Sequence, residues 1–150
     1  MKVVIQRVSR ASVIADGVLS GEIERGILAL VGINTGDDEK IMDFIIDKLV
    51  NLRIFEDENG KMNLSVKDIG GGILIVPNFT IYADASHGRR PSFAGGARPE
   101  EAEKIFERFI EKAEDTYENI GKGVFRADMK VELINDGPIT IILEKERDDL

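Results

Sequence analysis

The chain has 150 residues, and its 28 acidic and 20 basic side chains give a formal charge of −8 at pH 7. This length is typical of one domain, so we expect a single domain over residues 1–150, with an acidic tail over residues 144–150 that frays into solvent. The sequence contains no cysteine, which excludes a disulfide scaffold, a thiolate zinc site and a thiol nucleophile. The excess of acid argues against non-specific coating of nucleic acid, because that binding depends on basic charge.

The N-terminal segment does not resemble a targeting sequence. Residues 1–7 mix apolar and polar side chains and already include Lys2 and Arg7. No apolar stretch in the chain approaches the length of a signal peptide or a membrane span. We therefore expect a cytoplasmic protein without a membrane partner.

The first half of the chain shows strand signals followed by one helix signal. Strands are predicted over residues 3–8, 11–15, 18–24 and 27–33. Asp16-Gly17 predicts a tight hairpin turn, because both turn positions tolerate positive φ. After the capping side chains of residues 35–38, apolar residues recur at helical spacing and predict a helix to about Asn51.

The second half repeats this order of strand and helix signals. A short strand is predicted over residues 53–55, and a buried strand over 73–76 is expected to continue over 79–83 beyond Pro77. A loop rich in Gly, Ser and Pro follows to Pro99, where the clearest helix begins. Two further strands are predicted at residues 129–134 and 139–143, separated by residues 135–138. The order predicts an α+β fold with a mainly antiparallel sheet, a barrel-like core and two main helices.

Conventional catalytic apparatus is missing from the sequence. His87 is the single histidine and stands in a polar loop, where an exposed histidine is the favoured interpretation. There is no P-loop, dinucleotide-binding glycine motif or metal-ligand cluster, so we expect no metal and no cofactor. Asp37-Asp38 could form a metal or acid–base site, but carboxylates in this position are more typical of a helix N-terminus.

Two short segments interrupt the strand patterns in an unusual way. In residues 76–84, Pro77 and Asn78 interrupt a strand pattern and would expose main-chain amides and the Thr80 hydroxyl. The second segment, residues 135–140, contains Asn-Asp-Gly-Pro. On local grounds alone, an edge-strand bulge explains the first segment and a plain hairpin turn explains the second.

Taken together, these segments resemble the D-aminoacyl-tRNA deacylase family, the type first described with D-tyrosyl-tRNA. The resemblance covers residues 1 to about 143. It rests on the following matches in order: Gln6-Arg7-Val8, Ala11-Ser12-Val13, Gly21-Glu22-Ile23, Arg53-Ile54-Phe55, Gly60-Lys61-Met62-Asn63-Leu64, Phe79-Thr80, Arg90-Pro91-Ser92-Phe93, Ala127-Asp128-Met129 and Asn135-Asp136-Gly137-Pro138-Ile139-Thr140.

The resemblance implies a homodimeric hydrolase that cleaves the ester between a D-amino acid and the 3′-terminal ribose of tRNA. It implies that Gly137-Pro138 of one subunit enters the other subunit's pocket with a cis peptide bond. There the motif would bind the substrate's ammonium group and reject L-aminoacyl-tRNA, while glycyl-tRNA would be accepted.

The resemblance also implies roles for individual residues. Asn78, Phe79 and Thr80 are the catalytic candidates, with the amides of Phe79 and Thr80 stabilising the oxyanion. Arg7 would brace the Gly137-Pro138 loop, unless it is a surface arginine at a strand edge. Arg89, Arg90 and Arg98 would clamp phosphates of the acceptor end, unless they are solvated loop charges.

One departure from the family pattern keeps alternatives open. The usual active-site run is Ser-Gln-x-Thr, whereas this chain has Pro77-Asn78-Phe79-Thr80. Proline at the first position also occurs in the related animal-type deacylase, which removes mischarged L-alanine and has the Gly-Pro bond trans. The remaining alternative is a non-catalytic module that binds RNA ends.

Overall fold

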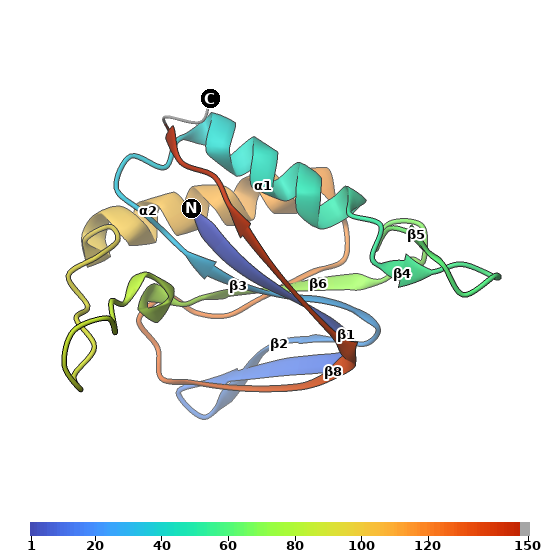
Figure 1. Cartoon of the computed structure of the whole chain (residues 1–150), viewed down its shortest axis with the longest axis horizontal. Coiled ribbons are helices and arrows are strands. Elements are labelled where there is room, and N and C mark those ends of the chain that lie inside the picture. The colour runs from blue at the N-terminus through green and yellow to red at the C-terminus, as the bar shows by residue number, and fades with distance from the viewer. Residues whose placement is uncertain (148–150) are drawn as a thin grey trace.

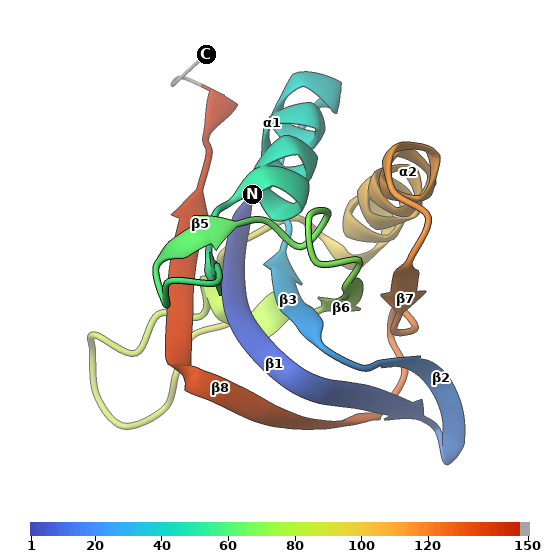
Figure 2. The same cartoon turned by 90° about the vertical axis from the view of Figure 1, so that its right-hand side faces the viewer.

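A computed structural model describes residues 1–147. A strongly curved sheet forms one layer, and two helices cover one of its faces (Figures 1 and 2). The sheet contains β1 (Lys2–Ala15), β2 (Val18–Ile23), β3 (Gly26–Gly32), β6 (Gly72–Pro77), β7 (Ile120–Lys122) and β8 (Met129–Glu144). The helices are α1 (Glu39–Asn51) and α2 (Pro99–Thr116). The predicted α+β class with two main helices is confirmed.

The sheet is mixed, and most of its pairing is antiparallel, as the sequence predicts. β1 pairs antiparallel with β2, β3 and β8, but β3–β6 and β6–β7 are parallel. Each parallel pair is joined by a crossover that contains one helix, as parallel strands require. β3 and β6 are almost entirely buried runs, the pattern expected of strands covered on both faces.

The curvature nearly closes the sheet into a barrel. The Ser20 hydroxyl on β2 donates to the Lys122 carbonyl on β7 at 2.6 Å. Two apolar clusters fill the interior. The larger packs the sheet against both helices, and the smaller, which includes Val8, Leu28 and Leu74, lies beneath Met129 and Val131 of β8.

The predicted first helix begins as its capping residues indicate. The Asp38 side chain accepts a hydrogen bond from the Ile41 amide at 3.1 Å, which confirms its place at the helix N-terminus. Asp37 is also buried there and pairs with the Met1 ammonium group at 2.8 Å. Burial raises the pKa of the Asp37 carboxyl above its ordinary value. The side chains of Asp37 and Asp38 therefore both make contacts that hold the start of α1 in place.

β8 runs along β1 in two halves. Residues 140–144 pair with residues 2–6 of β1, and residues 129–135 pair with residues 8–15. Residues 136–139 have no partner in this register, and Figure 2 shows a sharp corner in β8. Because both halves pair with β1 rather than with each other, the plain hairpin considered for this segment is excluded.

The segment after Pro77 differs from the sequence prediction. Residues 79–83 were expected to continue the strand, but Phe79–Tyr82 form a short 3-10 helix, η1. The Asn78 amide donates to the Val31 carbonyl at 2.8 Å, after which the Ile81 amide turns back to the Asn78 carbonyl at 3.3 Å. The chain therefore leaves the sheet at Asn78.

Smaller features complete the fold. β4 (Phe55–Glu56) and β5 (Met62–Leu64) form a separate two-stranded sheet. At the start of the predicted tail, the Lys145 amide donates to the Met1 carbonyl and the Glu146 side chain accepts from Asn34. Fraying of the tail stays a prediction. Residues 148–150 of the predicted tail lie outside the described residues. No helix among residues 1–147 is long and apolar enough to span a bilayer.

Candidate active site

The sequence-predicted catalytic residues lie together where β6 ends. Asn78 precedes η1, and the Thr80 hydroxyl donates to the Asn78 carboxamide oxygen at 2.6 Å. The first amide that donates a hydrogen bond within η1 is that of Ile81, so the amides of Phe79 and Thr80 precede the helical hydrogen bonds. Main-chain amides in that position are available to an anion or a carbonyl oxygen. The turn can therefore present two amides and one hydroxyl to a ligand.

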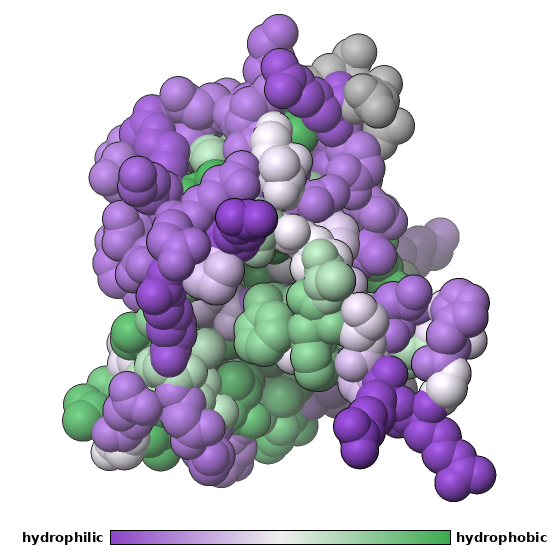
Figure 3. All heavy atoms as spheres, turned by 90° about the vertical axis from the view of Figure 1, so that its left-hand side faces the viewer, coloured by the Kyte–Doolittle hydropathy of each residue, from purple (hydrophilic) through white to green (hydrophobic). Residues whose placement is uncertain are grey.

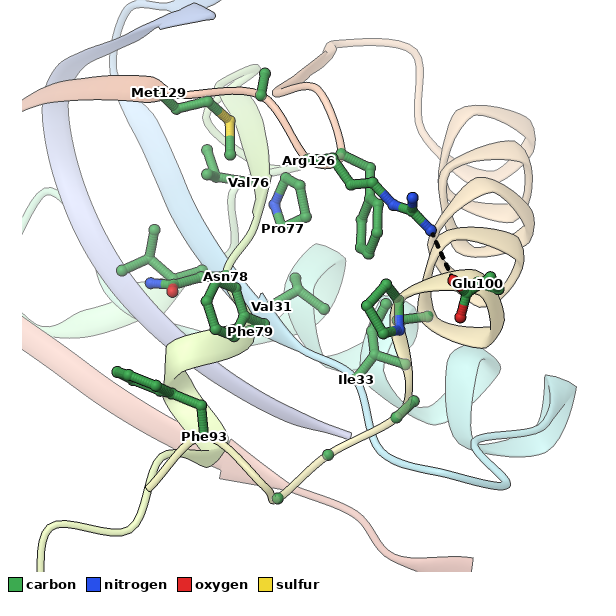
Figure 4. A pocket seen from close by; sticks show the side chains of 18 of the residues that line it. Val31, Ile33, Val76, Pro77, Asn78, Phe79, Phe93, Glu100, Arg126 and Met129 are labelled. Atoms are coloured by element: carbon green, nitrogen blue, oxygen red, sulfur yellow. Dashed lines mark ion pairs between the residues drawn. The ribbon is translucent and has the colours of Figure 1, made fainter. Parts of the chain in front are cut away.

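This turn borders a cavity of about 650 Å³. Figure 4 shows that Asn78 and Phe79 lie on its border with Pro77, beneath Met129 of β8. Most of its lining is apolar: Leu30, Val31, Ile33, Val76, Pro77, Phe79, Phe93, Ala97, Pro99, Ala102, Phe125, Ala127, Met129 and Val131. The volume and the apolar lining with few polar groups are typical of a small-molecule site.

Two exposed aromatic side chains stand at the cavity border. Phe79 from η1 and Phe93 from the long loop pack edge to face, with ring centroids 5.7 Å apart. Their exposed fractions are 67% and 55%. Mutual hydrogen bonds between the main chains of Asp84 and Ser92 close the base of this loop. Phe93 belongs to a run that carried the family resemblance, but sequence analysis gave it no role.

Arg7 is buried in the middle of β1, with 6% of its surface exposed. Its Nε donates to the Asp136 carbonyl at 3.1 Å, and one terminal nitrogen donates to the Ile54 carbonyl at 2.8 Å. The Asp136 carboxylate lies 3.5 Å from Nε. Arg7 is thus no surface arginine, and it holds the residue that precedes Gly137.

Gly137 and Pro138 are exposed at the corner of β8, and the peptide bond between them is cis. Asn135 supports the corner, since its side-chain oxygen accepts from the Ile139 amide at 3.1 Å and its side-chain nitrogen donates to the Thr140 hydroxyl at 3.0 Å. Neither Gly137 nor Pro138 lines the cavity. Within one chain, the structure does not bring this motif to Thr80.

The cationic loop candidates lie outside the cavity lining. Arg89 and Arg90 are exposed in the loop that projects from η1 (Figure 1), and Arg98 is the N-terminal flanking residue of α2. His87 is also exposed, and its Nδ1 lies 2.8 Å from the Ser86 hydroxyl. His87 therefore matches the expected exposed loop histidine.

Charge within the cavity comes from residues that sequence analysis did not single out. Arg126, in the turn before β8, and Glu100, in the first turn of α2, both line it and lie 3.7 Å apart. Neither belongs to a motif, so only the fold reveals them. Residues 1–147 contain no group of three His, Cys, Asp or Glu side chains placed to hold a metal ion.

Comparison with known sequences identifies the family of this chain. Residues 4–144 match the family model described as D-Tyr-tRNA(Tyr) deacylase. The chain belongs to this family. The D-aminoacyl-tRNA deacylase of Carboxydothermus hydrogenoformans is 52% identical over 96% of this chain and 99% of its own length. The protein of the same name from Clostridioides difficile is 50% identical over 98% of this chain and 99% of its own length.

Two solved structures have the same fold. One, titled "c-Myc DNA Unwinding Element Binding Protein", is 42% identical with a TM-score of 0.90 and covers 97% of this chain and 99% of its own. The other is described as a probable eukaryotic D-amino acid tRNA deacylase. It has a TM-score of 0.78 over 95% of this chain and 97% of its own, and at 14% identity it supports the fold alone.

Proposed function

We propose that this protein hydrolyses the ester bond of D-aminoacyl-tRNA, releasing the free D-amino acid and tRNA. The observation that carries the proposal is the turn at the end of β6 in a member of the deacylase family: Asn78 and Phe79 line an apolar cavity, and the Thr80 hydroxyl is hydrogen-bonded to Asn78. Curated relatives about half identical to this chain carry the name D-aminoacyl-tRNA deacylase. Because its substrate is made in the cytoplasm, we place the reaction there.

The proposed chemistry uses main-chain donors and water. A water oxygen attacks the ester carbonyl carbon, and the amides of Phe79 and Thr80 stabilise the oxyanion that forms. The bond to the ribose oxygen then breaks, and a proton from the water reaches that oxygen through the neighbouring ribose hydroxyl. Loss of one oxyanion donor typically costs about 2.7–4 kcal/mol of transition-state stabilisation.

Thr80 acts in this proposal by orienting water or substrate. A nucleophilic hydroxyl needs an adjacent general base. The Thr80 hydroxyl donates to the Asn78 carboxamide oxygen at 2.6 Å, and a carboxamide is not a base at neutral pH.

Chirality is read, in this proposal, by a second copy of the chain. Gly137-Pro138 of one subunit enters the partner's cavity, where its carbonyl oxygens accept hydrogen bonds from the substrate's ammonium group. With the ammonium and the ester carbonyl both fixed, an L side chain would collide with the motif, whereas a D side chain points away. The exposed position of the motif outside its own chain's cavity supports this arrangement.

Exposed apolar side chains support the dimer. Ile134 and Ile142 lie on either side of the motif on β8, with 47% and 68% of their surface exposed. Phe79 and Phe93 are exposed at the cavity border. Figure 3, which views the left-hand side of Figure 1, shows apolar side chains gathered at the centre and the lower left of this face. A contiguous apolar surface is typical of a protein interface.

The acceptor end of tRNA is the proposed polar partner. Arg89, Arg90 and Arg98 give the loop after η1 a local positive charge on an otherwise acidic protein. Such a patch can position phosphates while the overall charge keeps affinity low.

Release of amino acid from D-Tyr-tRNA and L-Tyr-tRNA, measured in parallel, tests the function. We expect rapid release from the D-substrate alone. Preferential release from mischarged L-Ala-tRNA would instead support the animal-type activity. Binding without hydrolysis of any ester would support an RNA-end-binding module.

Sedimentation equilibrium of Ile142→Asp tests the dimer. Burying an unpaired carboxylate is unfavourable, so we expect the dissociation constant to rise at least about tenfold and activity at low protein concentration to fall. Met62→Asp, which places the same charge on an exposed apolar residue of β5, is the control. An unchanged mass for the Ile142 variant would contradict the proposed interface.

A further inference from the structure

The main chain at Arg126 has a conformation that usually selects glycine. Its φ is +68°, and the only other non-glycine residue with positive φ among residues 1–147 is Asp16 in the β1–β2 hairpin turn. The Ala127 amide donates to the Val124 carbonyl at 3.3 Å, so Arg126 occupies the third position of a four-residue turn. With positive φ, that position favours glycine or asparagine. An arginine side chain is therefore held there at an energetic cost, which is a common feature of functional sites.

The Arg126 side chain lies on the cavity wall. It is the one cation among the described lining residues, whereas Arg89, Arg90 and Arg98 do not line the cavity. Figure 4 shows its guanidinium reaching from the turn before β8 toward Glu100 on α2.

The ion pairs of Arg126 are long and accessible to solvent. Its nitrogens lie 3.7 Å from a carboxylate oxygen of Glu100 and 3.7 Å from one of Glu103. Half of its side chain is exposed, as is 78% of the Glu100 side chain. Exposed ion pairs of this kind contribute little stability. The guanidinium can therefore exchange these carboxylates for a stronger anionic ligand.

We propose that Arg126 is a substrate-binding residue that contacts a phosphodiester of the RNA strand whose aminoacylated end enters the cavity. This inference rests on the proposed function. A D-aminoacyl ester carries a positive ammonium group, which Arg126 would repel, so the anion that the substrate offers is the phosphodiester. The planar guanidinium can bind two of its oxygens at once.

Paired substrates with and without a phosphodiester test this role. One substrate is adenosine esterified with D-tyrosine at its ribose, and the other is the trinucleotide CCA with the same ester. The variant is Arg126→Gly, because glycine adopts the positive φ of this position without strain. We expect its KM for the trinucleotide to rise about tenfold relative to its KM for the nucleoside, which is equivalent to about 1.4 kcal/mol. The kcat values should keep their ratio between the two substrates.

Three further variants separate this role from others. Arg126→Lys keeps the charge and should recover part of the loss. Glu100→Gln removes a competing carboxylate and should lower KM for the trinucleotide. Arg108→Gln is the charge-matched control, because Arg108 also pairs with glutamates but does not line the cavity.

The outcomes distinguish failure of this inference from failure of the proposed function. If Arg126→Gly changes KM equally for both substrates, or lowers the melting temperature without changing the ratio, Arg126 only joins the turn to α2 and the inference is overturned. If the wild-type protein cleaves neither ester nor D-Tyr-tRNA, the proposed function is overturned first and the inference falls with it.

Discussion

Arg7 shows why a single side chain could not be assigned from sequence. In the sequence, an arginine within a strand pattern fits a surface edge as well as a buried support. The deciding feature is the corner of β8, which brings the Asp136 carbonyl to Arg7 across 129 residues of chain. No local pattern near Arg7 predicts that contact. The family resemblance supplied the hypothesis, and the geometry supplies its physical basis.

Replacing Arg7 with methionine should lower both stability and activity. The substitution keeps an apolar stem but removes the donors to the Ile54 and Asp136 carbonyls. Loss of buried hydrogen bonds from a charged group typically costs about 1.5–3 kcal/mol. We expect the free energy of unfolding, measured in denaturant, to decrease by this amount. The free energy of activation for deacylation should change by more than this amount. Unchanged values of both would show that Arg7 does not support the corner.

Replacing Thr80 with alanine should weaken deacylation without abolishing it. The Thr80 hydroxyl makes one hydrogen bond, to Asn78, and the oxyanion donors are main-chain amides that the substitution retains. One neutral hydrogen bond contributes about 0.5–1.5 kcal/mol, so the single-turnover rate should fall by at most about tenfold. Thr80→Ser is the matched control and should stay near the wild-type rate. Complete loss of hydrolysis with folding and binding retained would favour a Thr80 nucleophile.

At the scale of elements, the sequence predicts most strands and both helices, because each has its own hydrophobic period and capping signals. The exceptions depend on long-range pairing. Residues 79–83 have the composition of a strand, yet no neighbouring strand continues beside β6, so the chain turns into η1. β7 is only three residues long and is held by β6 and by Ser20 of β2. Its own sequence carries too little pattern to predict it.

The long loop after η1 allows a test of phosphate binding. Replacing Arg89 and Arg90 together with alanine should weaken tRNA binding at low salt. The slope of log affinity against log salt should decrease by about one unit for each lost phosphate contact. The control is the double variant of Lys104 and Arg108, which removes two cations from the outer face of α2. Equal effects of the two double variants would show that only overall charge matters.

At the scale of the whole molecule, the two halves of the candidate site lie apart within one chain. Asn78 and Phe79 line the cavity, whereas Gly137-Pro138 is exposed at the corner of β8 and does not line it. A single chain does not join them, because the proposed contact is intermolecular. The sequence resemblance implied this division, and the exposed isoleucines beside the motif are consistent with it.

The proposed exclusion of L side chains leads to a prediction for glycyl-tRNA. The motif would recognise the substrate's ammonium group and would reject an L-residue only by collision with its side chain. Glycine has a hydrogen atom at that position, so nothing would exclude it. We therefore expect hydrolysis of Gly-tRNA and protection of L-Ala-tRNA, although the two amino acids differ by one methyl group. Release of amino acid from both substrates, at equal enzyme and tRNA concentrations, measures the difference.

The two possible failures of the glycine prediction have different meanings. Rapid hydrolysis of L-Ala-tRNA would show that the motif leaves room for an L methyl group, so the steric argument would be wrong. Inertness toward Gly-tRNA, with D-Tyr-tRNA still cleaved, would show that binding requires contact between a D side chain and the protein. A D-Ala-tRNA control separates these cases, because its methyl group is the smallest D side chain. If D-Ala-tRNA and Gly-tRNA are both cleaved while L-Ala-tRNA is retained, the position of one methyl group decides the reaction, as exclusion by a fixed main chain requires.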